Sequence, residues 1–298
     1  MDIYLNGNMA GEQAAHIRHD DAGLQHGVGL FETMAACHGR AFRLDEHLQR
    51  LLASAAELGL GQSLDIDQLR RAVETTLVHN QLDEARLRLT VTGGSLSLLR
   101  NEPEADHQPT ILAVATDPIA CDEEYFKNGV TVQIAPQAAN PFEPTAGHKT
   151  LAYWGRLRLL RQAASVGAAE AILLNISNHL ASGCVSNLFL VKKNNLLTPI
   201  ARGEEVRGAL PAPVLPGITR DVVVELAQGR DIAVEKRMLT IDDLLDADEV
   251  FLTNSSWQLL PVTAVEKKTI GDGEVGPVST DLRSGLLELI ETETTQDK

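Results

Sequence analysis

The stretch AGHKTLAYWGRL places a single lysine, Lys149, shortly before two aromatic residues, Tyr153 and Trp154. The other lysines of the chain stand in doublets, beside a turn or at the terminus. An amine in an apolar setting has its charged form disfavoured, so its pKa falls and it can attack carbonyl groups. A solvated lysine at the start of a helix is the alternative. Lys149 alone therefore does not indicate a catalytic role, and further candidate residues are needed.

A second candidate is LPGITRD, where Pro216 and Gly217 predict a tight turn directly before a helix. The first amides of that helix, at Gly217, Ile218 and Thr219, would have no partner within the helix. Together with the Thr219 hydroxyl and the helix dipole, these amides can bind an anion such as a phosphate. An ordinary capped helix would show the same residues.

Three further groups could face a ligand. Arg50 lies on the flank of an apolar helix in DEHLQRLLASAAELGL and could reach the edge of a cleft. Gly183 and Ser186 enter an apolar strand in SGCVSNLFLV, which indicates a bulge or the close approach of a ligand. Hydroxyl and amide side chains crowd the end of another strand at residues 253–256. Solvated helix surface or plain turns would explain each group equally well.

Composition narrows the possible functions. The chain has 298 residues and a formal net charge of -15, which argues against a nucleic-acid or anionic-membrane partner. The three cysteines, Cys37, Cys121 and Cys184, form no CxxC pair and no metal-ligand spacing, so we expect no metal site and a reducing compartment. The first residues lack a signal-peptide pattern, and no stretch is apolar enough to cross a membrane. We expect a cytoplasmic protein.

The sequence predicts a mixture of helices and strands that would position these residues. Hydrophobic spacing predicts helices over 65–78 and 150–166, and another that starts at residue 44 with Asp45 as its N-cap. Thr240 caps a further predicted helix in TIDDLLDAD. The Pro-containing segment APQAANPFEPTAG is the best linker candidate. We therefore expect a small N-terminal α+β domain over 1–134, a linker over 135–147 and a larger domain over 148–298.

In this order, the motifs resemble those of class IV (fold type IV) pyridoxal-phosphate enzymes, which include branched-chain and D-amino-acid aminotransferases and aminodeoxychorismate lyase. The resemblance covers nearly the whole chain, through YLNG, GLxxGxGxFET, HLxRL, HKT, GxxSNLFLV, LxTP, LPGITR and ADEVFLTNS to PV. It implies an α+β fold of two α/β-type domains, with pyridoxal 5'-phosphate held at their interface. It also implies a homodimer.

The resemblance assigns roles residue by residue. Lys149 matches the lysine that forms a Schiff base with the cofactor and then moves protons as general base and acid. Arg50 matches the arginine that clamps the cofactor phosphate. The other implied cofactor contacts are the phosphate ligands Ile218, Thr219 and Ser255, Leu215 packed on the pyridine ring, and Tyr153 near the phenolic oxygen of that ring. His26, Gly29 and Phe31 fall where relatives line the substrate pocket, and the Ser256 backbone faces the substrate carboxylate.

Two departures from the family pattern affect function. Relatives carry a glutamate that protonates the pyridine nitrogen where this chain has Ser182, and a serine hydroxyl cannot readily supply that proton. Relatives also read VTRG where this chain reads VTGG at residues 91–94. Arg86 and Arg88, on one face of the predicted strand, can compensate for the missing arginine, and we take Arg88 as a substrate residue.

The expected function is amino-group transfer between a small amino acid and a 2-oxo acid. Ser182 keeps two alternatives open: elimination of pyruvate from an aminodeoxychorismate-like substrate, and a non-catalytic or impaired paralogue. Substrate selection is expected in loops such as SLSLLRNEPEADH, residues 95–107.

Overall fold

The computed structural model describes residues 1–60, 64–95 and 108–295. They form two compact units. Unit 1 comprises Met1–Ile119, His148–Ala152 and Ile290–Lys298, and unit 2 comprises Ala120–Gly147 and Tyr153–Leu289. Most of the loop expected to select the substrate, from residue 96 to 107, lies outside the described residues.

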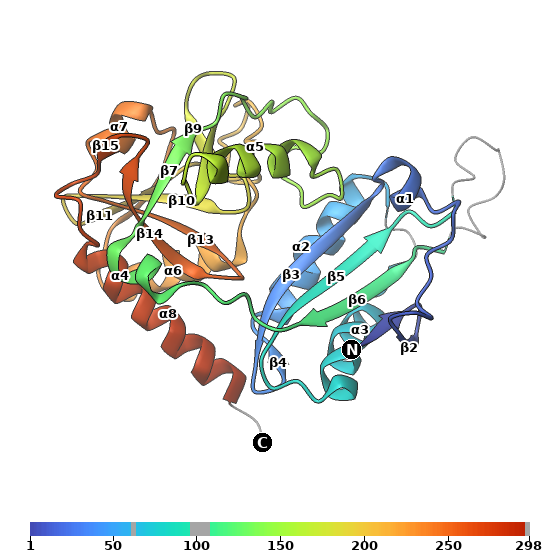
Figure 1. The fold of residues 1–298 in the computed structure, drawn as a ribbon. Helices are drawn as coiled ribbons and strands as arrows, with labels where there is room; N and C mark the ends of the chain where they lie inside the picture. Colours follow the sequence, from blue (N-terminus) through green and yellow to red (C-terminus); the bar gives the residue numbers. More distant parts are fainter. Residues whose placement is uncertain (61–63, 96–107, 296–298) are drawn as a thin grey trace. The chain divides into compact units, whose positions relative to one another are not determined.

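Unit 1 is built on an antiparallel six-stranded sheet in the order β2-β1-β6-β5-β3-β4 (Figure 1). The neighbouring strands β5 and β3 pair over eight residues, from Gly29 opposite Thr92 to Ala36 opposite Ala85. The strands are β1 (Asp2–Leu5), β2 (Asn8–Gly11), β3 (Gly29–Cys37), β4 (Arg40–Ala41), β5 (Ala85–Thr92) and β6 (Ile111–Thr116).

The helices of unit 1 are α1 (Ala22–His26), α2 (Leu44–Glu57) and α3 (Ile66–Asn80). The side chain of Asp65 caps α3 by accepting a hydrogen bond from the amide of Asp67, as a cap one residue before the helix should. The prediction that Asp45 caps α2 is wrong. The helix begins at Leu44, and its cap position is Arg43, which has a left-handed backbone with a φ of 52° and makes no side-chain cap.

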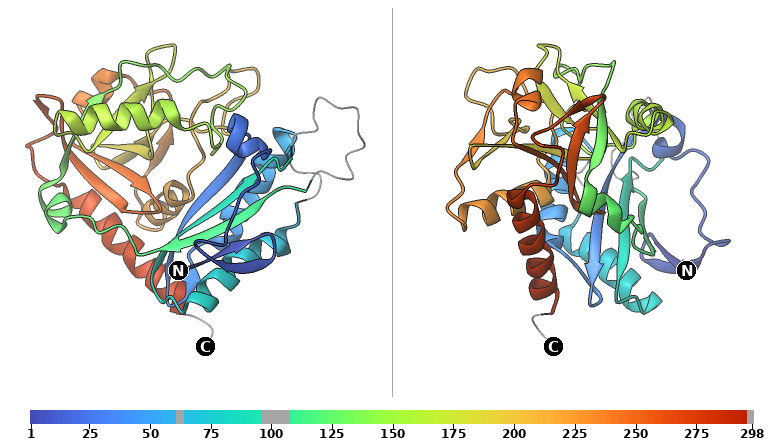
Figure 2. Two further views of the ribbon diagram at one scale, coloured as in Figure 1. Left: turned by 45° about the vertical axis from the view of Figure 1, so that its right-hand side comes forward. Right: turned by 60° about the vertical axis from the view of Figure 1, so that its left-hand side comes forward.

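Both long helices cover the same face of this sheet (Figure 2). Leu48 and Leu51 of α2 and Leu69 of α3 are buried against Leu87 and other apolar residues of the strands, and burial of each such side chain contributes about 1.5–3 kcal/mol. Since neighbouring residues of a strand point to opposite faces, Glu32 points toward α2, whereas Phe31 points to the other face.

Unit 2 contains a mixed nine-stranded sheet (Figure 1). Its order is β12-β11-β10-β13-β14-β7-β8-β9, with β15 paired to β14, and the pairs β11–β12, β14–β7 and β7–β8 are parallel. The strands are β7 (Val130–Ile134), β8 (Glu170–Leu174), β9 (Leu180–Gly183), β10 (Asn187–Lys192), β11 (Asn195–Thr198), β12 (Val234–Lys236), β13 (Glu249–Asn254), β14 (Gln258–Val265) and β15 (Lys268–Thr269).

The helices of unit 2 are α4 (Glu123–Asn128), α5 (Trp154–Ser165), α6 (Ile218–Gln228), α7 (Ile241–Leu245) and α8 (Pro277–Thr295), of which the residues from Ile290 on belong to unit 1. The predicted Thr240 cap is confirmed, because Thr240 and Asp243 form a reciprocal capping box at α7. Helix α5 begins at Trp154, later than predicted, so Lys149 precedes it by five residues.

Two segments lie elsewhere than the sequence indicated. Strand β7, expected in the first domain, pairs with β14 and β8 in the sheet of unit 2. The expected linker also belongs to unit 2, where the amides of Ala135 and Ala139 bond to the carbonyls of Ile172 and Leu174. Conversely, residues 148–152 belong to unit 1.

Arg220, on the first turn of α6, has no exposed surface although it is charged. Its Nη1 and Nη2 donate to Glu204 at 2.9 and 2.7 Å, and Nη2 also donates to the carbonyl of Pro199 at 3.1 Å. Burial would raise the pKa of Glu204, but hydrogen bonds from Arg220 and Lys236 outweigh it and hold that pKa at about 2. This buried ion pair fixes the loop after β11 to α6.

The mixture of helices with one antiparallel and one mixed sheet confirms the predicted α+β class. Among the described residues, no helix has the length and apolar character that a membrane span requires.

Candidate active site

Lys149 lies on a short segment of unit 1 that pairs with the start of β3. The amide of Phe31 donates to the Lys149 carbonyl at 2.9 Å, and the amide of Leu151 donates to the Gly29 carbonyl at 2.9 Å. A Cβ atom at Gly29 would come within 2.6 Å of a Leu151 methyl and 2.7 Å of the Val91 carbonyl, so this approach requires glycine. Two hydrogen bonds thus hold the segment that carries Lys149 against β3.

Two cationic side chains, those of Lys149 and Arg88, lie over the ring of Phe31. The Lys149 Nζ lies 4.5 Å from the ring centroid, and the Arg88 guanidinium carbon lies 3.7 Å from it. The negative face of an aromatic ring attracts each cation, with up to about 2 kcal/mol where water is excluded. The two cations repel each other, so an anion beside them would be attracted to both. The arrangement suits a substrate that carries a carboxylate.

Next to Lys149, His148 is a buried imidazole. Its Nε2 lies 3.6 Å from Oε1 of Glu57, but neither ring nitrogen makes a hydrogen bond within the described part of the chain. Burial lowers the pKa of His148. We therefore regard the His148 imidazole as neutral near pH 7. A neutral imidazole 3.6 Å from the Glu57 carboxylate does not form an ion pair.

Arg50 belongs to a buried cluster with Glu32 and His47. Its Nε donates to Glu32 Oε1 at 2.9 Å, its Nη2 donates to Glu32 Oε2, and His47 Nδ1 bonds the same Oε2 at 2.8 Å. Burial would raise the pKa of Glu32, but the Arg50 charge and the His47 bond outweigh it and hold that pKa at about 2. Glu32 orients the guanidinium.

In unit 2, the start of α6 presents amides without a side-chain cap. Gly217 occupies the cap position and forms no side-chain cap bond, and Thr219 in the first turn is buried. A Cβ atom at Gly217 would lie 2.0 Å from Oδ1 of Asn187, whose Nδ2 donates to the Leu215 carbonyl at 2.9 Å. Asn187 thus packs directly against the turn that begins α6, and Gly217 is needed for this contact.

The neighbouring end of β13 holds a buried hydroxyl that lacks a partner. Thr253 pairs with Asn187 across β10 and β13, and its Oγ1 has no hydrogen-bond partner among the described residues. Beyond it, Asn254 Oδ1 accepts from the amides of Ser256 and Trp257 at 2.8 and 3.0 Å. An unpaired buried hydroxyl is costly, and a phosphate oxygen could accept from it. Uncapped amides and this hydroxyl therefore fit the phosphate group of pyridoxal phosphate.

Ser182 is buried on β9, and its Oγ donates to its neighbour's carbonyl, Gly183 O, at 2.9 Å. The loop that follows is held by Glu170, which the sequence did not single out. Glu170 accepts from the amides of Cys184 and Val185 at 3.0 and 3.1 Å and from the Ser186 hydroxyl at 3.0 Å. Burial raises the pKa of Glu170 despite these bonds.

The remaining predicted site residues are placed as follows. Tyr153 Oη donates to the Cys184 carbonyl at 3.2 Å, and Tyr153 occupies the cap position of α5. His26 ends α1 and is exposed, whereas Leu215, Ile218, Ser255 and Ser256 are half-buried. Within unit 1 the structure brings Phe31, Arg88 and Lys149 together. Within unit 2 it brings Tyr153 and the loop after Ser182 together.

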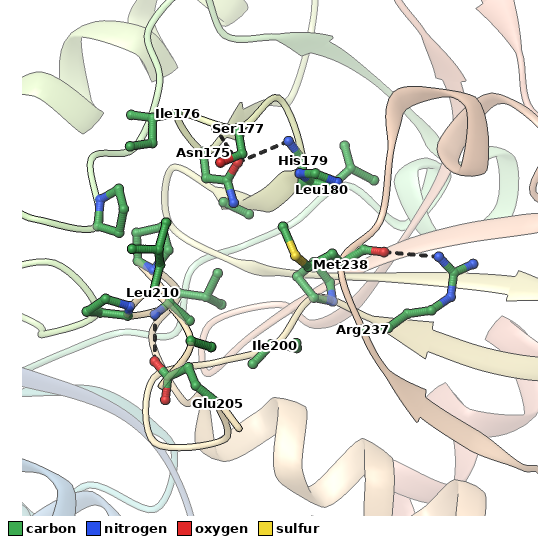
Figure 3. A pocket seen from close by; sticks show the side chains of 18 of the residues that line it. Asn175, Ile176, Ser177, His179, Leu180, Ile200, Glu205, Leu210, Arg237 and Met238 are labelled. Carbon is green, nitrogen blue, oxygen red and sulfur yellow. Dashed lines mark hydrogen bonds between the residues drawn. The ribbon is translucent and has the colours of Figure 1, made fainter. Parts of the chain in front are cut away.

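Unit 2 also contains a cavity of about 250 Å³ that is separate from these side chains (Figure 3). Ile176, Leu210 and Met238 lie around it, and Arg237 donates to the Met238 carbonyl. Ala181 of β9 lines the cavity. Ser182 does not line the cavity, and neither does any other of the predicted site residues.

The chain matches the family model for amino-transferase class IV over residues 29–265. It is 30% identical to a D-alanine aminotransferase of Bacillus licheniformis over 99% of both chains. A solved branched-chain amino acid aminotransferase of Escherichia coli has a TM-score of 0.88 at 28% identity, over 100% of this chain and 96% of that one. For 4-amino-4-deoxychorismate lyase from Pseudomonas aeruginosa the TM-score is 0.82 at 26% identity, over 96% and 98%.

These likenesses span both units and every motif discussed above. The chain belongs to the class IV aminotransferase family, with the fold type IV architecture of its aminotransferase neighbours.

Proposed function

We propose that the chain is a pyridoxal-phosphate-dependent aminotransferase that moves an amino group between a small amino acid and a 2-oxo acid. Lys149 is the catalytic residue: it holds the cofactor and moves a proton to and from the substrate Cα as general base and acid. The observation that carries the proposal is the position of Lys149. Its Nζ lies 4.5 Å from the centroid of the Phe31 ring, and its backbone segment is hydrogen-bonded to β3.

Pyridoxal 5'-phosphate is the cofactor on which the family depends. When bound, it would supply an electron sink for the charge that develops at the substrate Cα. The residues proposed to hold it are Arg50 with Ile218, Thr219 and Ser255 for the phosphate, and Leu215, Tyr153 and Ser182 for the ring. The fit of unit 2 to a phosphate rests on the uncapped start of α6 and the unpaired Thr253 hydroxyl.

The substrate is proposed to lie beside Phe31. Arg88 offers a positive charge to its carboxylate, the Ser256 backbone faces that carboxylate, and His26 lines the pocket. The short distance of 3.7 Å between the Arg88 guanidinium and the Phe31 ring supports this role for Arg88.

The proposal is tested by Lys149→Ala, with Lys127→Ala as control because Lys127 is an exposed helix residue that pairs with Glu124. The purified protein should show a cofactor absorbance band near the visible edge and convert an amino donor to its 2-oxo acid. Lys149→Ala should lose that band and at least 10²-fold of the turnover, and Lys127→Ala should keep both. A protein that stays colourless with added cofactor would contradict the proposal.

Elimination of pyruvate from an aminodeoxychorismate-like substrate is the second candidate. It is favoured by Ser182, whose hydroxyl already donates to Gly183 O and cannot readily protonate a pyridine nitrogen. An amino acid panel separates the two reactions. Conversion of the cofactor to its amine form means transfer, whereas pyruvate release without the amine form means elimination. Ser182→Glu should speed the first half of the transfer if the cofactor still binds normally.

We further propose that the protein works as a cytoplasmic homodimer, as the family resemblance implies. Among the described residues all three cysteines are free thiols, which supports a reducing compartment. Light scattering of the eluted protein should give twice the chain mass of 32.2 kDa. A monomer at micromolar concentration would contradict the dimer.

A further inference from the structure

Cys37 and His38 lie at a tight turn in unit 1, away from the side chains discussed above. Cys37 ends β3 and pairs with Arg40 of β4, so His38 and Gly39 form a two-residue hairpin turn. Both turn residues have positive φ angles, 52° at His38 and 74° at Gly39, as this kind of turn requires. The turn places a thiol and an imidazole on adjacent residues.

The C-terminal end of α8 brings a carboxylate to the same place. Oε1 of Glu291 lies 2.9 Å from His38 Nε2, and Oε2 of Glu291 accepts from the Cys37 Sγ at 3.8 Å. The three ligand atoms all lie within 4.8 Å of one another. Glu291 is separated from His38 by 253 residues, so sequence spacing could not reveal the cluster, and the expectation of no metal site rested on spacing alone.

The separations suit a small cation with tetrahedral coordination. Zinc takes thiolate sulfur at about 2.3 Å and imidazole nitrogen or carboxylate oxygen at about 2.0–2.2 Å, which places neighbouring ligand atoms roughly 3.3–3.6 Å apart. The N···O and S···O distances of 2.9 and 3.8 Å lie on either side of that range. Small side-chain rotations would bring all three atoms to one ion.

The charges around the thiol also favour a cation. The carboxylates of Glu291 and Glu84 place negative charge around the Cys37 thiol. A divalent ion would offset this negative field and bind the thiolate directly.

We propose that Cys37, His38 and Glu291 form a Zn²⁺ site whose fourth ligand is water. On binding, the thiol loses its proton to solvent, His38 coordinates through Nε2 with its proton on Nδ1, and Glu291 exchanges its two hydrogen bonds for a metal bond. No oxidation or reduction takes place. The soft sulfur and the imidazole select zinc over magnesium or calcium.

The ion would join the β3–β4 hairpin to the last turns of α8, both within unit 1. It would also convert Cys37, a partly exposed thiol, into a metal ligand that is protected from oxidation while the ion is bound. The site is independent of the proposed aminotransferase chemistry, since none of its residues is proposed to touch cofactor or substrate.

Cobalt(II) tests the site in the cofactor-loaded, full-length protein after treatment with a chelator. Difference spectra against a metal-free sample should show a sulfur-to-cobalt charge-transfer band with one ion per chain. Cys37→Ser should abolish that band, and Zn²⁺ should displace the cobalt. His38→Asn should weaken Zn²⁺ binding by about tenfold or more, while asparagine keeps the positive φ that the turn needs.

Two matched controls keep the outcome clear. Cys121→Ser removes another partly exposed thiol, and His79→Asn removes an imidazole that pairs with a carboxylate, Asp2, at 2.8 Å. Both variants should bind Zn²⁺ as the parent does. The proposal is overturned if the parent shows no thiolate–cobalt band, if Cys37→Ser keeps it, or if either control loses it.

Discussion

Both carboxylate oxygens of Glu32 accept hydrogen bonds from Arg50, one from Nε and one from Nη2, where β3 meets α2. A two-point bond of this kind fixes the plane of a guanidinium as well as its position. Arg50 is therefore oriented by the protein itself. A phosphate that bound it would not have to order a flexible side chain.

Glu32→Gln should destabilise the protein by roughly 3 kcal/mol near neutral pH, because it leaves Arg50 without its charged partner in a largely buried place. The pKa of Glu32 is lowered to about 2, so its contribution is present above the unfolded-state pKa and is lost as the pH falls toward 2. Urea unfolding from pH 7 down to pH 3 should show the difference between parent and variant shrinking. The exposed Glu12→Gln should match the parent throughout, and a difference that stays constant with pH would contradict this account.

Thr253→Val should have opposite effects on stability and on cofactor binding. The cofactor-free protein should be unchanged or stabilised by up to about 1–3 kcal/mol, since the variant removes an unpaired buried hydroxyl. Affinity for pyridoxal phosphate should fall if that hydroxyl faces the phosphate. Thr198→Val is the matched control, because its buried Oγ1 donates to the Leu188 carbonyl at 2.9 Å. That control should destabilise the protein, and equal losses in both variants would be evidence against an unpaired Thr253.

Gly217→Ala should destabilise the protein by about 1–3 kcal/mol and weaken cofactor binding. The reason is steric, since the added methyl would meet Asn187 Oδ1 at 2.0 Å. Gly155→Ala makes the same chemical change on α5, where a Cβ atom meets nothing within 4 Å. That variant should be as stable as the parent or more so, because alanine favours a helix. Thermal unfolding of both variants, with and without cofactor, checks the prediction.

Arg88→Met should raise KM for an amino acid substrate by about 10- to 100-fold, as expected when a charge-assisted bond to a carboxylate is lost. The methionine keeps much of the aliphatic stem, so packing on Phe31 should be partly retained. Arg86→Met, on the same strand and face, serves as the control and should leave KM unchanged. Steady-state kinetics with one donor at several concentrations decides, and a fall in kcat alone would argue for a different role of Arg88.

Features that depend on nearby residues were predictable from the sequence. The predicted cap at Thr240 follows from a side chain three residues away from the amide it bonds. The start of α2 at residue 44 is confirmed, but its predicted cap, Asp45, was wrong because the cap position falls on Arg43, whose left-handed backbone its residue type does not indicate. The position of β7 was missed because its partners in unit 2 come from distant parts of the chain.

In the candidate site, too, some residues could be predicted from sequence motifs, whereas others depend on contacts between distant parts of the chain. Phe31, Arg88 and Lys149 were named from motifs, and they lie together in unit 1. Glu32 and His47 were not named, although a signal existed: Glu32 follows Phe31, and His47 stands three residues before Arg50 on one helix face. Glu170 gave no such signal, because the amides that it binds lie 14 and 15 residues further along the chain.

The buried Arg220 has a consequence for how unit 2 opens. If the loop from Pro199 to Glu204 came away, the buried Arg220 guanidinium would lose its hydrogen bonds to Pro199 and Glu204. Release of the first turn of α6 would in turn remove both Arg220 hydrogen bonds from Glu204. Both events are costly, so the loop and the helix start should unfold together as one cooperative segment. Their amide hydrogens should therefore exchange with solvent at a common, slow rate, although one segment is a loop and the other is a helix.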